Sequence, residues 1–126
     1  MSKITLQTID QHLNDESLAL IDIREITECA QEGMIKGFNI IPFHTTLNAG
    51  TAFYPLDSTF DTWYFENEHT FKKHFPKDKT LVLLCRAGNR TRALEKALRY
   101  LGYKAIIDLG GIIDYKGDNL TYYKAL

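Results

Sequence analysis

Three short apolar runs, separated by helical patterns, constrain the fold of this chain more than any other feature. They cover residues 18–23, 80–85 and 105–109. Their apolar residues are continuous instead of alternating, which is typical of strands in a parallel sheet covered on both faces. Residues 4–6 and 38–41 are two weaker strand candidates. We therefore expect an α/β fold built on a mostly parallel sheet.

Helical patterns occupy the segments between these strands. Residues 26–32 predict a helix that ends at Gly33. The most regular pattern runs from about residue 89 to residue 101, with one apolar stripe and Gly102 as its stop. Strands that alternate with helices imply right-handed crossovers and helices on both faces of the sheet.

Two further segments carry weaker helical signals. Thr8 and Gln11 match a capping box for a short helix through Leu13. Residues 45–76 form an aromatic-rich insert, in which residues 66–75 predict a helix and the remainder an ordered loop. Its aromatic side chains are those of Phe53, Tyr54, Phe60, Trp63, Tyr64, Phe65, Phe71 and Phe75.

Length and charge exclude several classes of protein. The chain has 126 residues, which fits one domain over residues 1–126. A formal net charge of -1 gives no global attraction for nucleic acid or for a membrane surface. No apolar run is long enough to span a bilayer, and the N-terminus lacks the apolar stretch of a signal peptide. We expect a cytoplasmic protein, in which Cys29 and Cys85 do not form a structural disulfide.

The candidate site is the loop Cys85-Arg86-Ala87-Gly88-Asn89-Arg90, between a strand and the best helix. In open α/β sheets ligands bind at this carboxyl edge. A thiol at a helix N-terminus meets unpaired N–H groups and the positive end of the helix dipole, and both favour its thiolate form. The arginines at positions 86, 90 and 92 add positive charge, and Gly88 allows the loop to curl around the sulfur.

Such a loop is a small anion cradle with a nucleophile at its base. It suits attack on a sulfur or phosphorus centre that carries oxyanions, with Arg86 and Arg90 as clamps. The alternative is an inert buried cysteine that ends a core strand, which is common for a lone cysteine. Three arginines, a glycine and a helix start around Cys85 favour the functional interpretation.

Four segments together resemble the single-domain rhodanese family of sulfurtransferases. They are the Asp22-x-Arg24 strand end, the glycine-spaced turn over residues 33–42, the Cys85 loop, and Gly102-Tyr103 followed by Leu109-Gly-Gly-Ile112. The resemblance covers nearly the whole chain except the aromatic insert. It implies a five-stranded, mostly parallel sheet flanked by helices.

The resemblance also implies a two-step reaction without a metal or organic cofactor. Cys85 takes sulfane sulfur from thiosulfate or a persulfide donor, and a thiol, a protein or cyanide then accepts it. By the same resemblance, the loop residues that follow Cys85 bind the substrate, and Asp22 and Arg24 support the site. The loop residues are Arg86, Ala87, Gly88, Asn89, Arg90 and Thr91.

Two other classes of function stay open. A phosphatase or arsenate reductase of the same fold needs five residues between cysteine and arginine, but Thr91 stands at that position. Arg90 comes one position early and Arg92 one position late, which favours sulfur transfer. A persulfide carrier or interaction module that serves a protein partner is the second alternative, and the intact loop favours the carrier over a module without chemistry.

The remaining polar candidates have structural interpretations. Asp22 and Arg24 can pair with each other or with the loop, and a structural ion pair is the preferred reading. Cys29 could resolve a persulfide, but packing on its helix is the simpler role. The four histidines form no cluster with metal-ligand spacing, so we expect no metal site.

Overall fold

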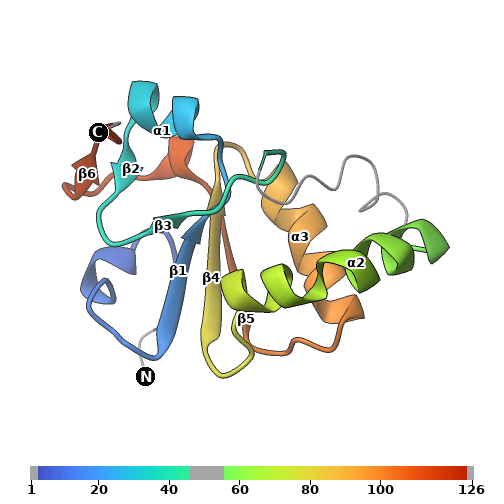
Figure 1. Cartoon of the computed structure of the whole chain (residues 1–126). Coiled ribbons are helices and arrows are strands. Elements are labelled where there is room, and N and C mark those ends of the chain that lie inside the picture. Colours follow the sequence, from blue (N-terminus) through green and yellow to red (C-terminus); the bar gives the residue numbers. More distant parts are fainter. Residues whose placement is uncertain (1–2, 46–55, 125–126) are drawn as a thin grey trace.

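A parallel sheet organises the chain, whose computed structural model describes residues 3–45 and 56–124. Four strands form this sheet in the order β3-β1-β4-β5 (Figure 1). They are β1 (Leu18–Asp22), β3 (Asn39–Ile40), β4 (Thr80–Cys85) and β5 (Ile106–Gly111). The α/β class with a parallel sheet is confirmed, although this sheet has four strands where the family resemblance implied five.

Two segments outside this sheet differ from what the sequence predicts. The expected strand over residues 4–6 is wrong, because the Thr8 hydroxyl accepts a hydrogen bond from the Thr5 N–H at 2.9 Å and folds this segment into a turn. A separate antiparallel pair, β2 (Met34–Ile35) with β6 (Leu120–Thr121), was not predicted from the sequence.

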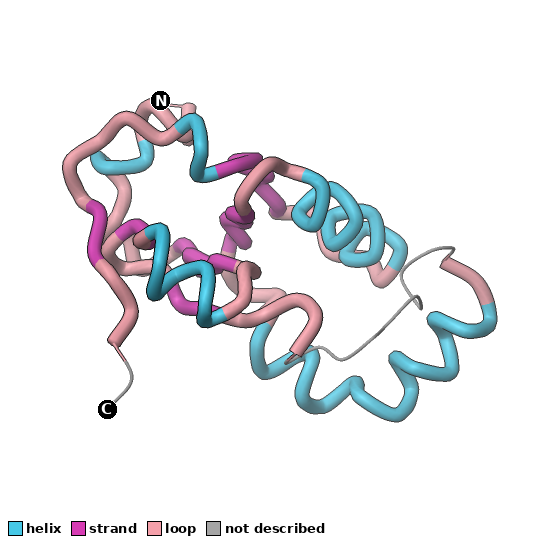
Figure 2. Tube along the Cα trace, turned by 90° about the horizontal axis from the view of Figure 1, so that it is seen from above, coloured by secondary structure: helices cyan, strands magenta, loops and turns pink. Residues whose placement is uncertain are grey.

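Helices cover both faces of the sheet. The described helices are α1 (Ile26–Glu32), α2 (Ser58–His74) and α3 (Asn89–Tyr100), with short 3-10 turns η1 (Ile9–Gln11) and η2 (Ile112–Asp114). Figure 2 shows the strands at the centre with helices on either side. The bounds of α1 agree with the prediction, and those of α3 agree to within one residue. Thr8 does not cap η1 with its side chain, so the capping box expected there is wrong.

The aromatic-rich insert contains a longer helix than its sequence predicts. α2 begins at Ser58, because the Asp57 carboxylate accepts a hydrogen bond from the Thr59 N–H at 2.9 Å and caps the first turn. Phe60 and Phe71 of α2 are buried in the core, whereas Phe65 is 85% exposed. Residues 46–55, which include the aromatic positions 53 and 54, lie outside the described residues.

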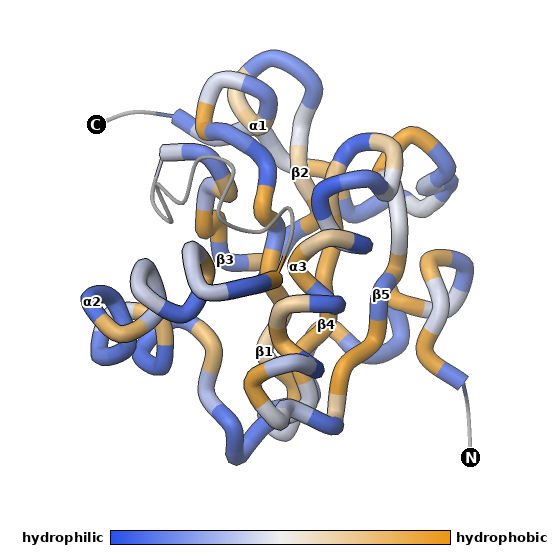
Figure 3. Tube along the Cα trace, turned by 90° about the vertical axis from the view of Figure 1, so that its right-hand side faces the viewer, coloured by the Kyte–Doolittle hydropathy of each residue, from blue (hydrophilic) through white to orange (hydrophobic). Residues whose placement is uncertain are grey.

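Alternate residues of the central strands fill two separate cores. Leu81, Leu83 and Cys85 of β4 face α2 and α3, whereas Val82 and Leu84 face α1 and η1. Figure 3 shows hydrophobic residues concentrated along β1 and β4 and hydrophilic residues on the outer helix surfaces. This double burial explains the continuous apolar runs in the sequence. None of the helices within residues 3–45 and 56–124 is long and apolar enough to cross a membrane.

A bulge in β5 positions the chain that follows β4. The pairing of β4 with β5 shifts between Leu83 and Leu84, and the Gly110 N–H donates to the Asp108 carboxylate at 2.8 Å. The shift brings Gly111 against the backbone of Arg86 and Ala87. A Cβ atom at position 111 would lie 2.7 Å from the Ala87 Cα and closer still to the Arg86 carbonyl oxygen. Only glycine therefore permits this approach.

We expect Gly111→Ala to reduce the free energy of unfolding by about 3 kcal/mol, because neither backbone neighbour can rotate away from the added methyl group. Gly110→Ala is the matched comparison: nothing lies within 4 Å of its added Cβ, but its φ of 83° is unfavourable for alanine. That strain costs about 1 kcal/mol. Urea denaturation measures both variants, and a Gly111→Ala chain as stable as wild type would contradict the close approach.

Candidate active site

Cys85 lies at the end of β4 beneath a loop that curls around its sulfur. The side chain is buried, and its Sγ accepts a hydrogen bond from the Gly88 N–H at 3.0 Å. Gly88 has a φ of 100°, a left-handed conformation that other residues rarely adopt, and it caps the N-terminus of α3. This single residue turns the chain back over the sulfur and starts the helix.

Thr91 completes the contacts of the sulfur. Its Oγ1 lies 3.5 Å from the Cys85 Sγ and 3.2 Å from the Gly88 carbonyl oxygen, to which it donates a hydrogen bond. Thr91 is fully buried, whereas Arg86, Ala87 and Asn89 are exposed on the outside of the loop. The Gly88 N–H and the Thr91 hydroxyl thus line the inside of the loop beside the sulfur, and Arg86, Ala87 and Asn89 form its solvent-facing rim.

Both arginines of the loop are engaged by carboxylates of α1. Arg90 forms a bidentate pair with Glu28, with Nη1–Oε1 at 2.6 Å and Nη2–Oε2 at 2.9 Å. Arg86 donates from Nε to Glu32 Oε1 at 3.0 Å. The hydrogen bonds from Arg90 lower the pKa of Glu28 and, in return, those to Glu28 raise the pKa of Arg90. Both members of this pair are charged at neutral pH.

The roles of Glu28 and Glu32 were not predicted from the sequence. Glu28 and Glu32 are four residues apart on one helix, and Arg86 and Arg90 have the same spacing in the loop. Each pair of equal spacing can face the other, but nothing in the sequence places α1 beside the loop. Figure 1 shows α1 at the carboxyl edge of the sheet, beside the turn from β4 into α3.

Asp22 and Arg24 form a buried ion pair on the other side of the sheet. The Arg24 Nη2 lies 2.8 Å from the Asp22 Oδ2 and donates to the Gly33 carbonyl oxygen at 2.7 Å. Burial disfavours the charge of Arg24, but the hydrogen bonds and charge of Asp22 outweigh it and raise the pKa of the guanidinium. Asp22 lies beside Leu84 in the sheet, so it faces away from the Cys85 side chain. The pair joins the end of β1 to Gly33, the C-cap of α1, on the face of the sheet away from the Cys85 sulfur.

The second cysteine lies close to this buried pair. The Cys29 Sγ is 3.9 Å from the Asp22 Oδ2 and is fully buried. Burial and the negative charge of Asp22 raise the pKa of the Cys29 thiol to about 12. Cys29 is therefore a protonated thiol at neutral pH, which agrees with a packing role.

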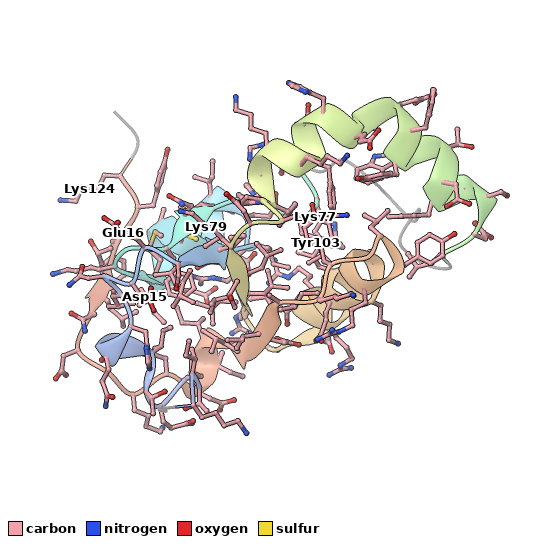
Figure 4. All side chains as sticks on the ribbon, turned by 90° about the horizontal axis from the view of Figure 1, so that it is seen from below. Asp15, Glu16, Lys77, Lys79, Tyr103 and Lys124 are labelled. Atoms are coloured by element: carbon pink, nitrogen blue, oxygen red, sulfur yellow. The ribbon has the colours of Figure 1, made fainter. Side chains whose placement is uncertain are left out.

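A cavity of about 460 Å³ lies at the opposite end of the sheet, away from the loop. Asp15, Glu16 and Lys79 line it, and Figure 4 shows them together at that end. It holds neither cysteine, so its size alone does not make it the centre of the chemistry. Within residues 3–45 and 56–124, no three His, Cys, Asp or Glu side chains form a group that could hold a metal ion.

Comparison with known proteins gives a family match over most of the chain. The model of the family described as "Rhodanese-like domain" matches residues 5–118. Comparison of the sequence with curated proteins gives no significant match.

Three solved structures have a similar fold. A rhodanese-like domain protein from Staphylococcus aureus is 18% identical with a TM-score of 0.63, covering 98% of this chain and 100% of that one. A single-domain sulfurtransferase from Saccharomyces cerevisiae is 22% identical with a TM-score of 0.58, covering 89% and 85%. A Rhodopseudomonas palustris protein described as a possible tyrosine phosphatase is 22% identical with a TM-score of 0.56, covering 86% and 75%. At such identities the likenesses show the fold alone.

The raised pKa of Cys29 predicts a specific loss of stability in alkaline solution. The thiol ionises near its ordinary value of 9.0 in the unfolded chain but only near 12 in the folded one. The protonated Cys29 thiol thus makes its full contribution to the free energy of unfolding below pH 9. That contribution is lost as the pH rises towards 12, by up to about 1.4 kcal/mol per pH unit. Cys29→Ala should be less stable at pH 8 but should lose less stability between pH 9 and pH 10. Urea denaturation at each pH measures this, and equal slopes would refute the assignment.

Proposed function

The chain belongs to the family of rhodanese-like domains, and we propose that it transfers sulfane sulfur through a persulfide on Cys85. The observation that carries this proposal is the hydrogen bond of 3.0 Å from the Gly88 N–H to the Cys85 sulfur. A donor aimed at the sulfur from the start of a helix favours the thiolate, which is the nucleophilic form. The proposal covers residues 1–126 as one such domain.

The first step loads the sulfur. The Cys85 thiolate attacks the sulfane sulfur of thiosulfate or of a persulfide donor, and a new S–S bond forms. The old bond to that sulfur breaks, and sulfite or a thiolate leaves with the electron pair. The exposed rim of Arg86, Ala87 and Asn89 receives the donor, while Gly88 and Thr91 hold the reacting sulfur.

The second step unloads it. An acceptor thiolate or cyanide attacks the outer sulfur of the persulfide, and Cys85 leaves as the thiolate that began the cycle. No cofactor enters this sequence, and a reducing cytoplasmic compartment suits it because Cys29 and Cys85 are both free thiols. Asp22 and Arg24 support the site indirectly by joining the end of β1 to Gly33, the C-cap of α1.

Incubation with thiosulfate or with cysteine persulfide should add the mass of one sulfur atom to the intact protein, because the loop thiolate forms a persulfide. Mass spectrometry measures the gain, which dithiothreitol should reverse. Cys85→Ser should show no gain, and Cys29→Ala should load as the wild type does.

Two outcomes would contradict the proposal. A gain that persists in Cys85→Ser places the sulfur on another residue. If neither donor adds sulfur, the transfer function is wrong, and hydrolysis of para-nitrophenyl phosphate by the same sample would then favour the phosphatase alternative.

A further inference from the structure

We propose that Glu28 and Glu32 set the donor class of this site, so that it takes sulfur from thiol persulfides with at most one negative charge in preference to dianions such as thiosulfate. The inference rests on the proposed function and narrows it. It starts from the two ion pairs that join α1 to the loop around Cys85.

The Glu28–Arg90 pair removes the strongest anion clamp from the loop. Both terminal nitrogens of Arg90 are bonded to the two carboxylate oxygens, at 2.6 Å and 2.9 Å. The side chains are only 19% and 22% exposed, so water screens the pair incompletely. An oxyanion that needs Arg90 must displace a bidentate, partly buried carboxylate, and that exchange costs most of what the new contact supplies.

Glu28 is also held in place by its own helix. Its Oε1 accepts a hydrogen bond from the Glu25 N–H at 3.0 Å, while the Glu25 side chain accepts one from the Glu28 N–H. This reciprocal capping box fixes the carboxylate before any donor arrives. Glu28 therefore gives up this hydrogen bond as well as its pair with Arg90 if it swings aside.

The Arg86–Glu32 pair neutralises a second positive charge of the loop. Arg86 and Glu32 lie on the outside, with side chains 52% and 41% exposed, so this pair is weaker and screened by water. Glu28 and Glu32 thus match Arg90 and Arg86 one to one. A dianion approaching the loop meets two carboxylates as well as the two guanidinium groups that they bind.

A thiol persulfide avoids this obstacle because it carries no sulfonate group to clamp. The Cys85 thiolate attacks its terminal sulfur, the S–S bond of the donor breaks, and the donor thiolate leaves with the electron pair. The proton of the terminal sulfur stays on the new Cys85 persulfide, so atoms and charge balance. Only the Gly88 N–H and the Thr91 hydroxyl are needed around the transferred sulfur.

The test compares the rates at which thiosulfate and cysteine persulfide load Cys85, measured by intact mass after rapid alkylation. Wild type should load faster from cysteine persulfide. Glu28→Gln, and Glu28→Gln combined with Glu32→Gln, should raise kcat/KM for thiosulfate about tenfold, the size of one hydrogen bond to a charged group. The variants should show a lower KM for thiosulfate, because Arg90 freed from Glu28 binds the dianion directly. Added salt should reduce this effect by screening the charges.

Glu95→Gln is the matched control. It breaks another Arg–Glu pair, with Arg99 Nη2 at 2.9 Å from Glu95 Oε2, on the same helix as Arg90 but away from the sulfur. This variant should leave the rates with both donors unchanged. Glutamine at position 28 keeps an oxygen for the Glu25 N–H, and Glu32→Gln alone alters only the exposed pair, so the series retains a folded member.

Equal losses with both donors in the Glu28 and Glu32 variants would overturn the inference, because they would mean that the glutamates only hold the loop in shape. An unchanged ratio of the two rates would overturn it as well. In both cases Cys85 still takes up sulfur and the proposed function stands. If wild type takes sulfur from neither donor, the proposed function itself fails, and the donor preference fails with it.

Discussion

The hydrogen bond from the Gly88 N–H to the Cys85 sulfur is the contact on which the arrangement of the site depends. It requires a left-handed residue at position 88, which also starts α3. The backbone of this loop approaches the end of β5 closely at Gly111, and the bulge before Gly111 allows that approach. One backbone requirement thus links the end of β4, the start of α3 and the end of β5, three elements that the parallel topology brings to the same edge.

Charge adds a second constraint to the same edge. A loop with several arginines needs counter-charges when it packs against another element, and α1 provides them through Glu28 and Glu32. The same pairs that hold the loop against α1 also occupy its cations. The proposed donor preference follows from this dual role, because the two Arg90 N–H groups that bind Glu28 are not free for a substrate oxyanion.

The sequence predicted those features whose signals are local. Continuous apolar runs located β1 and β4, and Gly33 and Gly102 marked where α1 and α3 end. Features that depend on distant partners were missed. The turn at residues 4–6 is set by the Thr8 hydroxyl, and the last residues of β5 pair only because of a bulge. The Glu28–Arg90 pair joins residues 62 positions apart, and no local pattern indicates such a contact.

The two cysteines show why burial alone does not define a reactive thiol. Cys29 and Cys85 are both fully buried on opposite faces of the sheet. Burial and the neighbouring Asp22 carboxylate both disfavour ionisation of Cys29 and raise its pKa to about 12. Cys85 instead has a backbone N–H directed at its sulfur and a helix beginning beside it. The group next to the sulfur therefore separates the packing cysteine from the proposed nucleophile: a carboxylate at the end of β1 beside Cys29, and a backbone N–H at the start of α3 beside Cys85.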